Sequence, residues 1–242
     1  MPAILTLENI SKRFGAVVVA DGIDLVLADG EALGIIGPNG AGKTTLFGMA
    51  TGSVKPDAGR VVVAGKDITR LPPERRCRKG LARSFQIPQP FAGMTVFENV
   101  VVAAAFGNNE REAAVYGRCA NLLERCGLAD KANKRAGGLT LLDRKRLELA
   151  RALATKPRVL LLDEGAGGLT EHECTALVAL IKDVRAEGVA IVWIEHVVHA
   201  LLAIVDRLAV LHGGNFIATG DPHTVIKSPQ VSEIYMGIEA DA

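Results

Sequence analysis

A glycine-rich segment near the N-terminus has the residue types and spacing that bind a phosphate group. Residues 37–44 read GPNGAGKT and fit the pattern G-x-x-x-x-G-K-[ST] at every fixed position. Glycines let the backbone bend so that consecutive N–H groups face one anion, and a helix that starts there directs its positive end at the same point. Lys43 supplies a mobile positive charge for the outer phosphates, and the Thr44 hydroxyl is a suitable Mg²⁺ ligand. The predicted binding residues are Gly37, Pro38, Asn39, Gly40, Ala41, Gly42, Lys43, Thr44 and Thr45.

A second set of polar residues follows an all-apolar run later in the chain. Val159 to Leu162 has the composition of a strand buried on both faces, and Asp163 and Glu164 come directly after it. We predict that Asp163 holds the Mg²⁺ shell and that the Glu164 carboxylate polarises a water for in-line attack on the terminal phosphate. Two solvated acids at a strand end are the alternative, and the phosphate loop favours the catalytic interpretation.

The elements that must position these residues change in character along the chain. The first third has β-branched and alternating patterns, the middle third has helical composition, and strands then alternate with helices. A Thr170/Glu173 pair predicts a capping box at one helix start, and a glycine pair predicts a hairpin over 208–219. The predicted strands cover 23–27, 31–36, 61–63, 159–162 and 189–194, and the predicted helices cover 45–50, 110–127, 141–155 and 170–187.

Composition excludes several classes of protein. The 242 residues are 49% hydrophobic with a formal net charge of +1, which argues against disorder and against a protein that coats nucleic acid. The longest apolar stretches, Val100 to Phe106 and Val197 to Val205, are shorter than the ~18 residues that span a bilayer, and the first ten residues show no export signal. The four cysteines, Cys77, Cys119, Cys126 and Cys174, form no C-x-x-C pair, so we expect reduced, buried thiols in a cytosolic protein.

Over nearly its whole length the chain resembles the ATP-binding-cassette (ABC) ATPases. The resemblance rests on GPNGAGKTT at 37–45, on the Asp163–Glu164 pair and on the long stretch between them. It implies an α/β fold, a P-loop NTPase of ABC type with a mixed β core and N-terminal antiparallel strands. It further implies a single domain over 1–242 with a helical subdomain inserted at about 87–156, and ATP and Mg²⁺ as ligands.

Three further residues match family features in the family's order. Phe14 resembles the aromatic residue that stacks on adenine, although a surface or core role for it stays open. Gln86, in RSFQ at 83–86, resembles the glutamine that touches Mg²⁺, and His196, in IEH at 194–196, resembles the histidine that reaches the γ-phosphate. The resemblance thus implies Glu164 and His196 as catalytic residues and Thr44, Gln86 and Asp163 as metal ligands.

Two segments depart from the family pattern. The signature loop, normally Leu-Ser-Gly-Gly-Gln, corresponds to LTLLD at 139–143, where Thr140 keeps a hydroxyl for nucleotide and predicts a capping box with Asp143. We expect Leu141 and Leu142 to hinder close backbone approach to a phosphate, and Asp143 to add a charge of the wrong sign. In the second segment, Gly165 replaces the usual proline and GGLT at 167–170 ends in Thr where the family usually has Asp.

Within the family, the likeness is strongest to ATPase subunits of branched-chain amino-acid importers. It rests on ARSFQ at 82–86, MTVFENV at 94–100, RLELAR at 146–151, IEH at 194–196 and VSEIYMG at 231–237. It implies ATP hydrolysis at the cytoplasmic face of the membrane, powering import of these amino acids or a related small solute through permease subunits, with a solute-binding protein outside. A second ATPase subunit completes the assembly, and the altered 139–143 loop favours a different subunit over a second copy.

Three other interpretations stay open at this point. These are an ATPase for another cargo such as lipopolysaccharide, a DNA-repair or chromosome-type ATPase head, and a nucleotide-binding regulator without hydrolysis. The basic stretch at 70–83 favours nucleic acid, but we interpret it as a solvated helix face and predict no nucleic-acid partner. An apolar group, Phe91, Met94, Val96 and Phe97, is the candidate permease contact, with packing inside the helical insertion as its alternative.

Overall fold

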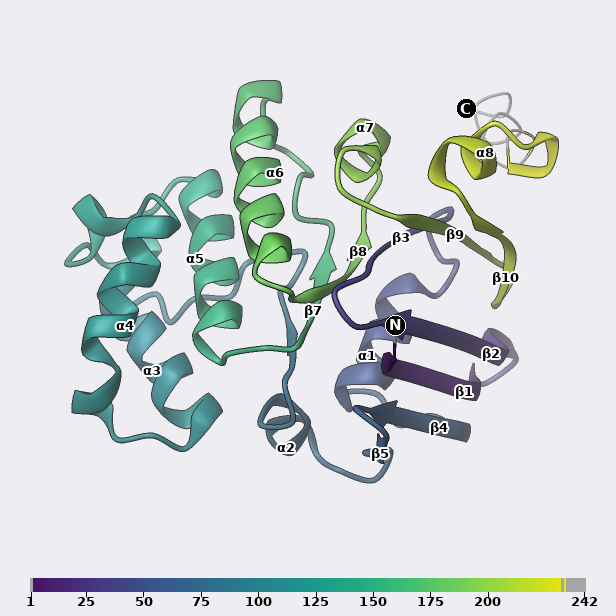
Figure 1. Cartoon of the computed structure of the whole chain (residues 1–242), viewed down its shortest axis with the longest axis horizontal. Coiled ribbons are helices and arrows are strands. Elements are labelled where there is room, and N and C mark those ends of the chain that lie inside the picture. Colours follow the sequence, from purple (N-terminus) through teal and green to yellow (C-terminus); the bar gives the residue numbers. More distant parts are fainter. Residues whose placement is uncertain (1, 232, 234–242) are drawn as a thin grey trace.

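Two β-sheets form the framework that carries the phosphate loop, and the computed structural model describes residues 2–231 and 233 (Figure 1). The first sheet is antiparallel in the order β2-β1-β4-β5, and the second has the order β10-β9-β3-β8-β7-β6 with only β10 antiparallel to its neighbour. The strands are β1 (Ala3–Phe14), β2 (Val17–Ala28), β3 (Ala32–Ile36), β4 (Ala58–Val63), β5 (Lys66–Asp67), β6 (Leu81–Arg83), β7 (Val159–Asp163), β8 (Ala190–Ile194), β9 (Arg207–His212) and β10 (Asn215–Gly220).

The four predicted helices are present as α1, α4, α5 and α6, whereas α2, α3, α7 and α8 were not predicted. The Thr170/Glu173 capping box is present at the start of α6, and the hairpin predicted over 208–219 is formed by β9 and β10. The helices are α1 (Lys43–Thr51), α2 (Pro73–Cys77), α3 (Val96–Asn108), α4 (Glu112–Arg125), α5 (Leu141–Ala154), α6 (Glu171–Ala186), α7 (Val198–Leu202) and α8 (Pro222–Ile226), with 3-10 turns η1 (Ala129–Lys131) and η2 (Ala136–Gly138).

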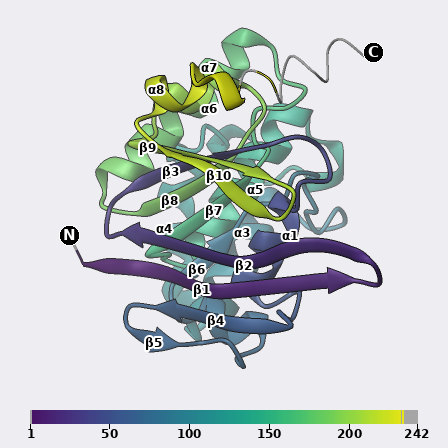
Figure 2. The same ribbon diagram turned by 90° about the vertical axis from the view of Figure 1, so that its right-hand side faces the viewer.

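Two hydrophobic cores lie on opposite faces of the second sheet. Alternate residues of β7 show this: Val159 and Leu161 belong to one core, and Leu160 and Leu162 belong to the other. The first core joins the sheet to α1 and to the antiparallel sheet, which faces the viewer in Figure 2. The second joins it to α3 through α7. A strand buried on both faces reads as a continuous apolar run, which is why this strand was recognisable from sequence.

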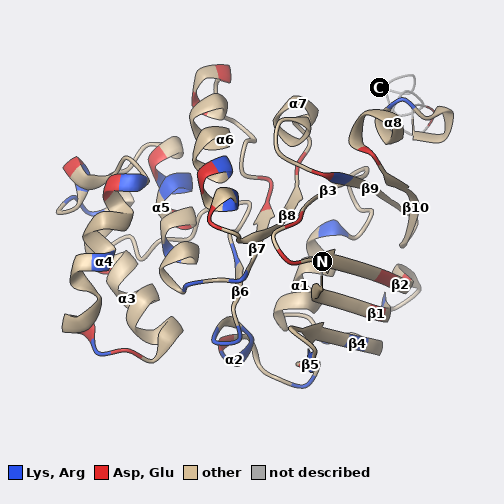
Figure 3. Cartoon of the chain, viewed as in Figure 1, with Lys and Arg blue, Asp and Glu red and all other residues tan. Residues whose placement is uncertain are grey.

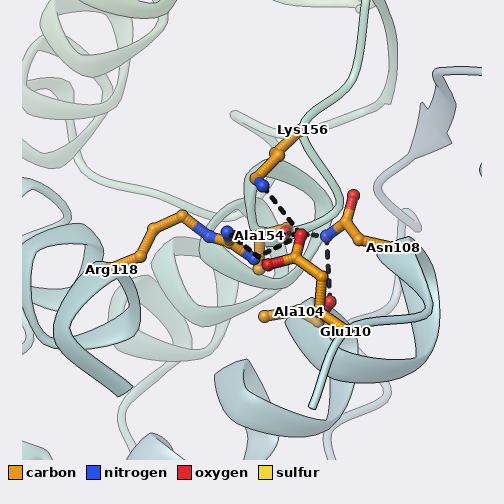
Figure 4. Close-up of polar contacts among 6 residues, drawn as sticks. All are labelled: Ala104, Asn108, Glu110, Arg118, Ala154 and Lys156. Carbon is orange, nitrogen blue, oxygen red and sulfur yellow. Dashed lines mark hydrogen bonds and ion pairs between the residues drawn. The ribbon is translucent and has the colours of Figure 1, made fainter. Parts of the chain in front are cut away.

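Three helices, α3, α4 and α5, pack together at one end of the molecule (Figure 1). A polar network joins them (Figure 4): the Asn108 side-chain amide donates to the carbonyls of Ala104 and Ala154, each at 2.9 Å. The Glu110 carboxylate accepts from Arg118 at 3.0 Å and from Lys156 at 2.7 Å. The end of α3, the body of α4 and the segment after α5 are thereby held together, and these helices occupy most of residues 96–154.

The prediction that the basic stretch at 70–83 is a solvated helix face is wrong for two of its residues. Arg76 is 2% exposed and donates to the carbonyls of Met49 and Ala50 at the end of α1, at 2.7 and 2.8 Å. Arg83 lies under the sheet edge and pairs with Asp163. A cation that satisfies the free carbonyls at a helix C-terminus is stabilised there by the helix dipole. Elsewhere both acidic and basic residues occur on the same helices, for example on α5 and α6 (Figure 3).

Candidate functional site

A pocket of about 320 Å³ lies at the turn between β3 and α1. Its wall combines the glycine-rich loop, the first turn of α1, the end of β1 and two side chains from the segments after β6 and β7. The lining residues are Phe14, Val19, Asn39, Gly40, Ala41, Gly42, Lys43, Thr44, Thr45, Gln86 and Glu164. The sequence predicted ten of these eleven residues as site residues, from segments up to 150 residues apart in the chain. The fold therefore brings the predicted phosphate loop, Phe14, Gln86 and Glu164 to one cavity.

The loop takes a backbone conformation that needs glycine at two positions. Gly40 and Gly42 have φ values of 81° and 98°, in the left-handed region that side chains disfavour. A Cβ atom at Gly42 would also lie 2.5 Å from the Val19 carbonyl oxygen. Gly42 caps the N-terminus of α1 and has no side chain that could accept the first amide hydrogens. The start of α1 is therefore open to an anion.

The Lys43 ammonium group lies beside the carboxylates of the site. The residue is 5% exposed, and its Nζ donates to the carbonyls of Gly37 at 2.7 Å and Pro38 at 3.0 Å. An ammonium has three donor hydrogens, so one remains for another acceptor. Burial lowers the Lys43 pKa, and the nearby charges of Glu164 and Asp163 act in the opposite direction. The group thus lies next to the loop where phosphate oxygens would gather.

Asp163 ends β7 as predicted, but it has a partner that the sequence did not reveal. Its Oδ2 accepts from Arg83 at 2.5 Å, and its Oδ1 is buried without a hydrogen-bond partner in the described part of the chain. A buried carboxylate oxygen without a donor is costly, and a bound cation is one way to satisfy it. No group of three His, Cys, Asp or Glu side chains within residues 2–231 and 233 could hold a metal by itself. The donor set fits an ion that takes its remaining ligands from phosphate or water.

Glu164 is the residue at which three elements meet. Its φ is +47°, a left-handed conformation that is uncommon for a non-glycine residue, and its amide donates to Ile194 O at 2.8 Å. One carboxylate oxygen hydrogen-bonds Gln86, and the other lies 3.0 Å from His196 Nε2. The strained turn therefore aims the carboxylate at Gln86 and His196, which the resemblance gave as a metal ligand and a γ-phosphate contact and not as partners of Glu164. His196 itself is exposed and does not line the pocket.

Phe14 lies at the rim of the pocket, at the end of β1. Its side chain is 52% exposed, and the Lys12 ammonium lies 5.2 Å from the ring centroid. An exposed ring beside a phosphate loop offers a flat apolar surface, which suits stacking with a base. The alternative that Phe14 is a core residue is excluded by this exposure.

The 139–143 segment lies apart from this pocket, and one expectation for it is wrong. Thr140 caps α5 by accepting the Asp143 amide at 3.3 Å, but the Asp143 carboxylate does not complete a capping box. It is 4% exposed and pairs with Lys131, with N–O distances of 2.9 and 2.8 Å. Asp143 therefore presents no free negative charge at the surface. Leu141 is 45% exposed, so the first residue of the helix presents a leucine side chain at the surface.

The remaining predictions concern the apolar group, the cysteines, the C-terminal stretch and membrane-spanning helices. In the apolar group around 91–97, Phe91 is exposed, but Val96 is fully buried and Phe97 packs against Tyr116, so the group is partly internal packing. Cys119, Cys126 and Cys174 are buried free thiols as expected, and Cys77 is half-buried. In the stretch 231–237, residues 232 and 234–237 lie outside the described residues. None of the helices described is long and apolar enough to cross a membrane.

Comparison with known proteins decides the family. The model of the ABC transporter family matches residues 20–167, a span that includes the phosphate loop and the Asp163–Glu164 pair. The chain belongs to the ABC transporter family. It is an ATPase of that family with the α/β fold that its sequence predicted. The interpretation as a regulator without hydrolysis is therefore excluded, and ATP is the nucleotide of this chain.

Individual relatives match this chain along nearly its whole length. The chain is 37% identical to the high-affinity branched-chain amino acid transport ATP-binding protein BraF of Pseudomonas aeruginosa, over 97% of this chain and 98% of that protein. It is 34% identical to the lipopolysaccharide export system ATP-binding protein LptB of Acidithiobacillus ferridurans, over 98% of both chains. The ADP conformation of MJ1267, an ATP-binding cassette of an ABC transporter, superimposes with a TM-score of 0.90 and 32% identity, over 98% of this chain and all of that chain.

Proposed function

We propose that this ATPase powers membrane import of branched-chain amino acids or a related small solute. The observation that supports it most is the pocket that joins the phosphate loop to Glu164 in a chain that is 37% identical to BraF. Lys43, the open helix start and the loop amides bind the phosphates, and Phe14 stacks on the adenine. Gly37 to Thr45 thus form the binding element.

Glu164 is the general base in this proposal. Water attacks the γ-phosphorus, its proton passes to the Glu164 carboxylate, and the bond from the γ-phosphorus to the bridging oxygen breaks to leave ADP and phosphate. His196 and Gln86, which hydrogen-bond the two carboxylate oxygens, orient that carboxylate and reach toward the γ-phosphate side of the pocket. Hydrolysis therefore depends on the orientation that the turn gives Glu164 as much as on the basicity of its carboxylate.

Thr44, Gln86 and Asp163 hold Mg²⁺ in this proposal. Thr44 and Gln86 line the pocket, and the unpartnered Asp163 oxygen is the acceptor that a cation satisfies. A bound Mg²⁺ neutralises charge on the outer phosphates. Arg83, which already pairs with Asp163, fixes the orientation of that carboxylate.

The working assembly has several parts. We propose a second ATPase subunit, different from this chain, and permease subunits in the membrane, with a solute-binding protein outside and no nucleic acid. The chain is then peripheral, on the cytoplasmic face of the membrane, and residues 87–156 act as a helical subdomain that receives the permease. The exposed rings of Phe85 and Phe91 and the Ile87 side chain suit such a contact.

One alternative cargo has specific support. The identity to LptB is 34%, close to the 37% for BraF, so a lipopolysaccharide system is the second candidate. The cargo is selected by the permease rather than by this chain, and the decisive experiment must include that subunit.

The test is purification of the tagged full chain from its native membrane together with its bound subunits, followed by reconstitution into vesicles. We expect ATP-dependent accumulation of labelled leucine, abolished by Lys43→Ala and unchanged by Lys66→Ala, a lysine that is exposed in β5. ATP hydrolysis without accumulation of leucine, isoleucine or valine would contradict amino-acid import. ATP-dependent release of lipopolysaccharide from the same vesicles would support the alternative.

A further inference from the structure

The turn after β7 has little rigidity of its own, although it must hold Glu164. Three of the next four residues are glycines, Gly165, Gly167 and Gly168, and glycine has the largest backbone freedom of any residue. Glu164 nevertheless adopts a left-handed conformation, which costs free energy and persists only where surrounding contacts enforce it. Contacts from outside the turn must therefore hold it.

Two buried ionisable side chains from different elements supply such contacts. Lys145, on the second turn of α5, donates from its Nζ to the Glu164 carbonyl at 3.2 Å. Glu195, directly after β8, accepts the Ala166 amide on its Oε1 at 2.8 Å. Lys145 is 8% exposed and Glu195 is 1% exposed. The two side chains thus bracket the peptide groups at 164–166.

Burying these two ionisable side chains costs free energy, so their presence calls for a structural or functional reason. Burial raises the Glu195 pKa to about 7, and the Ala166 amide and the Lys145 charge act in the opposite direction. Burial likewise lowers the Lys145 pKa, opposed by the charges of Glu195 and Glu164. An apolar residue at either place would avoid the desolvation cost. Neither side chain lines the nucleotide pocket, so neither acts on substrate directly.

The end of β8 and the two residues after it contact the turn. The Ile194 carbonyl accepts the Glu164 amide, the Glu195 carboxylate accepts the Ala166 amide, and the His196 ring reaches the Glu164 carboxylate. Lys145, from α5, adds the hydrogen bond to the Glu164 carbonyl. Backbone and side chain of the general base are thereby fixed from two elements, β8 and α5.

We infer that Lys145 and Glu195 are positioning residues that hold the 164–166 turn so that the Glu164 carboxylate stays aimed at the γ-phosphate side of the pocket. The inference rests on the proposed role of Glu164 in hydrolysis. It concerns geometry, since a displacement of about 1 Å in a catalytic group can cost a hundredfold in rate. Nucleotide binding, which uses the phosphate loop, does not depend on it.

The experiment uses the full chain in its purified assembly with the partner ATPase and permease subunits, and compares it with the Glu195→Leu and Lys145→Met variants. We expect kcat for ATP hydrolysis to fall roughly 10- to 100-fold with the KM for ATP changed less than about twofold, as for a misplaced general base. Glu195→Gln, whose side-chain carbonyl can still accept the Ala166 amide, restores most of the rate. Lys182→Met, at an exposed lysine of α6, serves as the matched control and keeps the wild-type rate.

Two further readouts separate positioning from a general loss of stability. Amide hydrogen exchange over 164–170 rises in Glu195→Leu while the phosphate-loop peptides stay protected. In a Glu164→Gln background, adding Glu195→Leu lowers the rate less than about twofold, because the carboxylate being positioned is already gone. A wild-type kcat in both variants, an equal loss in the Glu164→Gln background, or unchanged exchange over 164–170 would overturn the inference.

Failure of the proposed function gives a different pattern. If Glu164→Gln itself turned over ATP at the wild-type rate, the general-base role would fail, and exchange over 164–170 would still decide whether Lys145 and Glu195 hold the turn.

Discussion

The starts of α1 and α5 show how differently two helix N-termini of one chain are finished. At α1 the cap is Gly42 in a left-handed conformation, no side chain takes the first amides, and Lys43 follows at once. At α5 the cap is Thr140, whose hydroxyl takes the Asp143 amide, and the exposed Leu141 side chain follows. Both helices direct a positive dipole end outward. Only the first has no side-chain acceptor for its backbone amides.

The difference distinguishes a helix start that can bind a phosphate from one that is only capped. A phosphate needs several amides within hydrogen-bond distance, which glycines allow and leucine side chains prevent. At α5 the acidic side chain pairs with Lys131 and is buried, so the leucine side chains, and not a free negative charge, distinguish the two ends. We therefore propose that this chain supplies a complete phosphate loop and a weakened signature loop to the assembly.

The largest expected effect is at α1. Lys43→Ala removes the cation beside the phosphate oxygens, so we expect loss of productive ATP binding as well as several kcal/mol of transition-state stabilisation, which together abolish measurable turnover. Steady-state hydrolysis and binding of a fluorescent ATP analogue measure both losses, with Lys66→Ala as the control. Normal affinity and turnover in Lys43→Ala would show that this helix start is not the phosphate site.

A smaller effect is expected at Glu164. Glu164→Gln keeps the hydrogen-bonding shape but removes the base, so hydrolysis should fall by ~10² to 10⁴ while ATP still binds. Light scattering with ATP should detect a trapped dimer of ATPase subunits. Glu171→Gln, at an exposed acid on the first residue of α6, should behave as wild type. Wild-type turnover in Glu164→Gln would remove Glu164 as the base.

Restoring glycines at α5 should produce a modest gain. Leu141→Gly with Leu142→Gly uncovers the amides, and even part of the value of a backbone donor to a phosphate would raise turnover of the assembly at least about twofold. Helix stability falls at the same time, by roughly 0.5–1 kcal/mol per glycine, which a thermal melt records. No gain in turnover would show that the two leucine side chains do not limit ATP turnover at the site that this loop completes.

The smallest effect is expected from the cap itself. Thr140→Ala leaves the Asp143 amide without its acceptor and should destabilise the chain by about 1 kcal/mol in chemical denaturation, whereas Thr140→Ser should not. A stability unchanged by Thr140→Ala would mean that water replaces the hydroxyl at no cost.

Sequence reasoning succeeded where one short pattern contains both the geometry and the chemistry. The glycines and Lys43 lie within one turn, and Asp163 and Glu164 follow a strand that reads as a continuous apolar run. It failed for Arg76, Arg83, Lys145 and Glu195, which read as ordinary charged residues. Their partners lie far along the chain, as Arg83 and Asp163 do, so burial is decided by tertiary packing. A Glu directly after an all-apolar strand was the one local signal available for Glu195.

The expected charge effect of Asp143 failed for the same reason. Position three of a helix with Thr at its cap suggests a capping box, yet Lys131, twelve residues earlier, takes the carboxylate. Local pattern and tertiary contact compete, and the ion pair prevailed in a place that is 4% exposed.

The most direct test of the unequal helix starts inactivates one nucleotide site at a time in the reconstituted assembly and measures ATP turnover and transport. Lys43→Ala in this chain disables the site built on its own phosphate loop, and the matching lysine change in the partner disables the site covered by Leu141 and Leu142. We predict that the first change stops transport and that the second reduces it only mildly. Equal losses from the two changes would contradict the account.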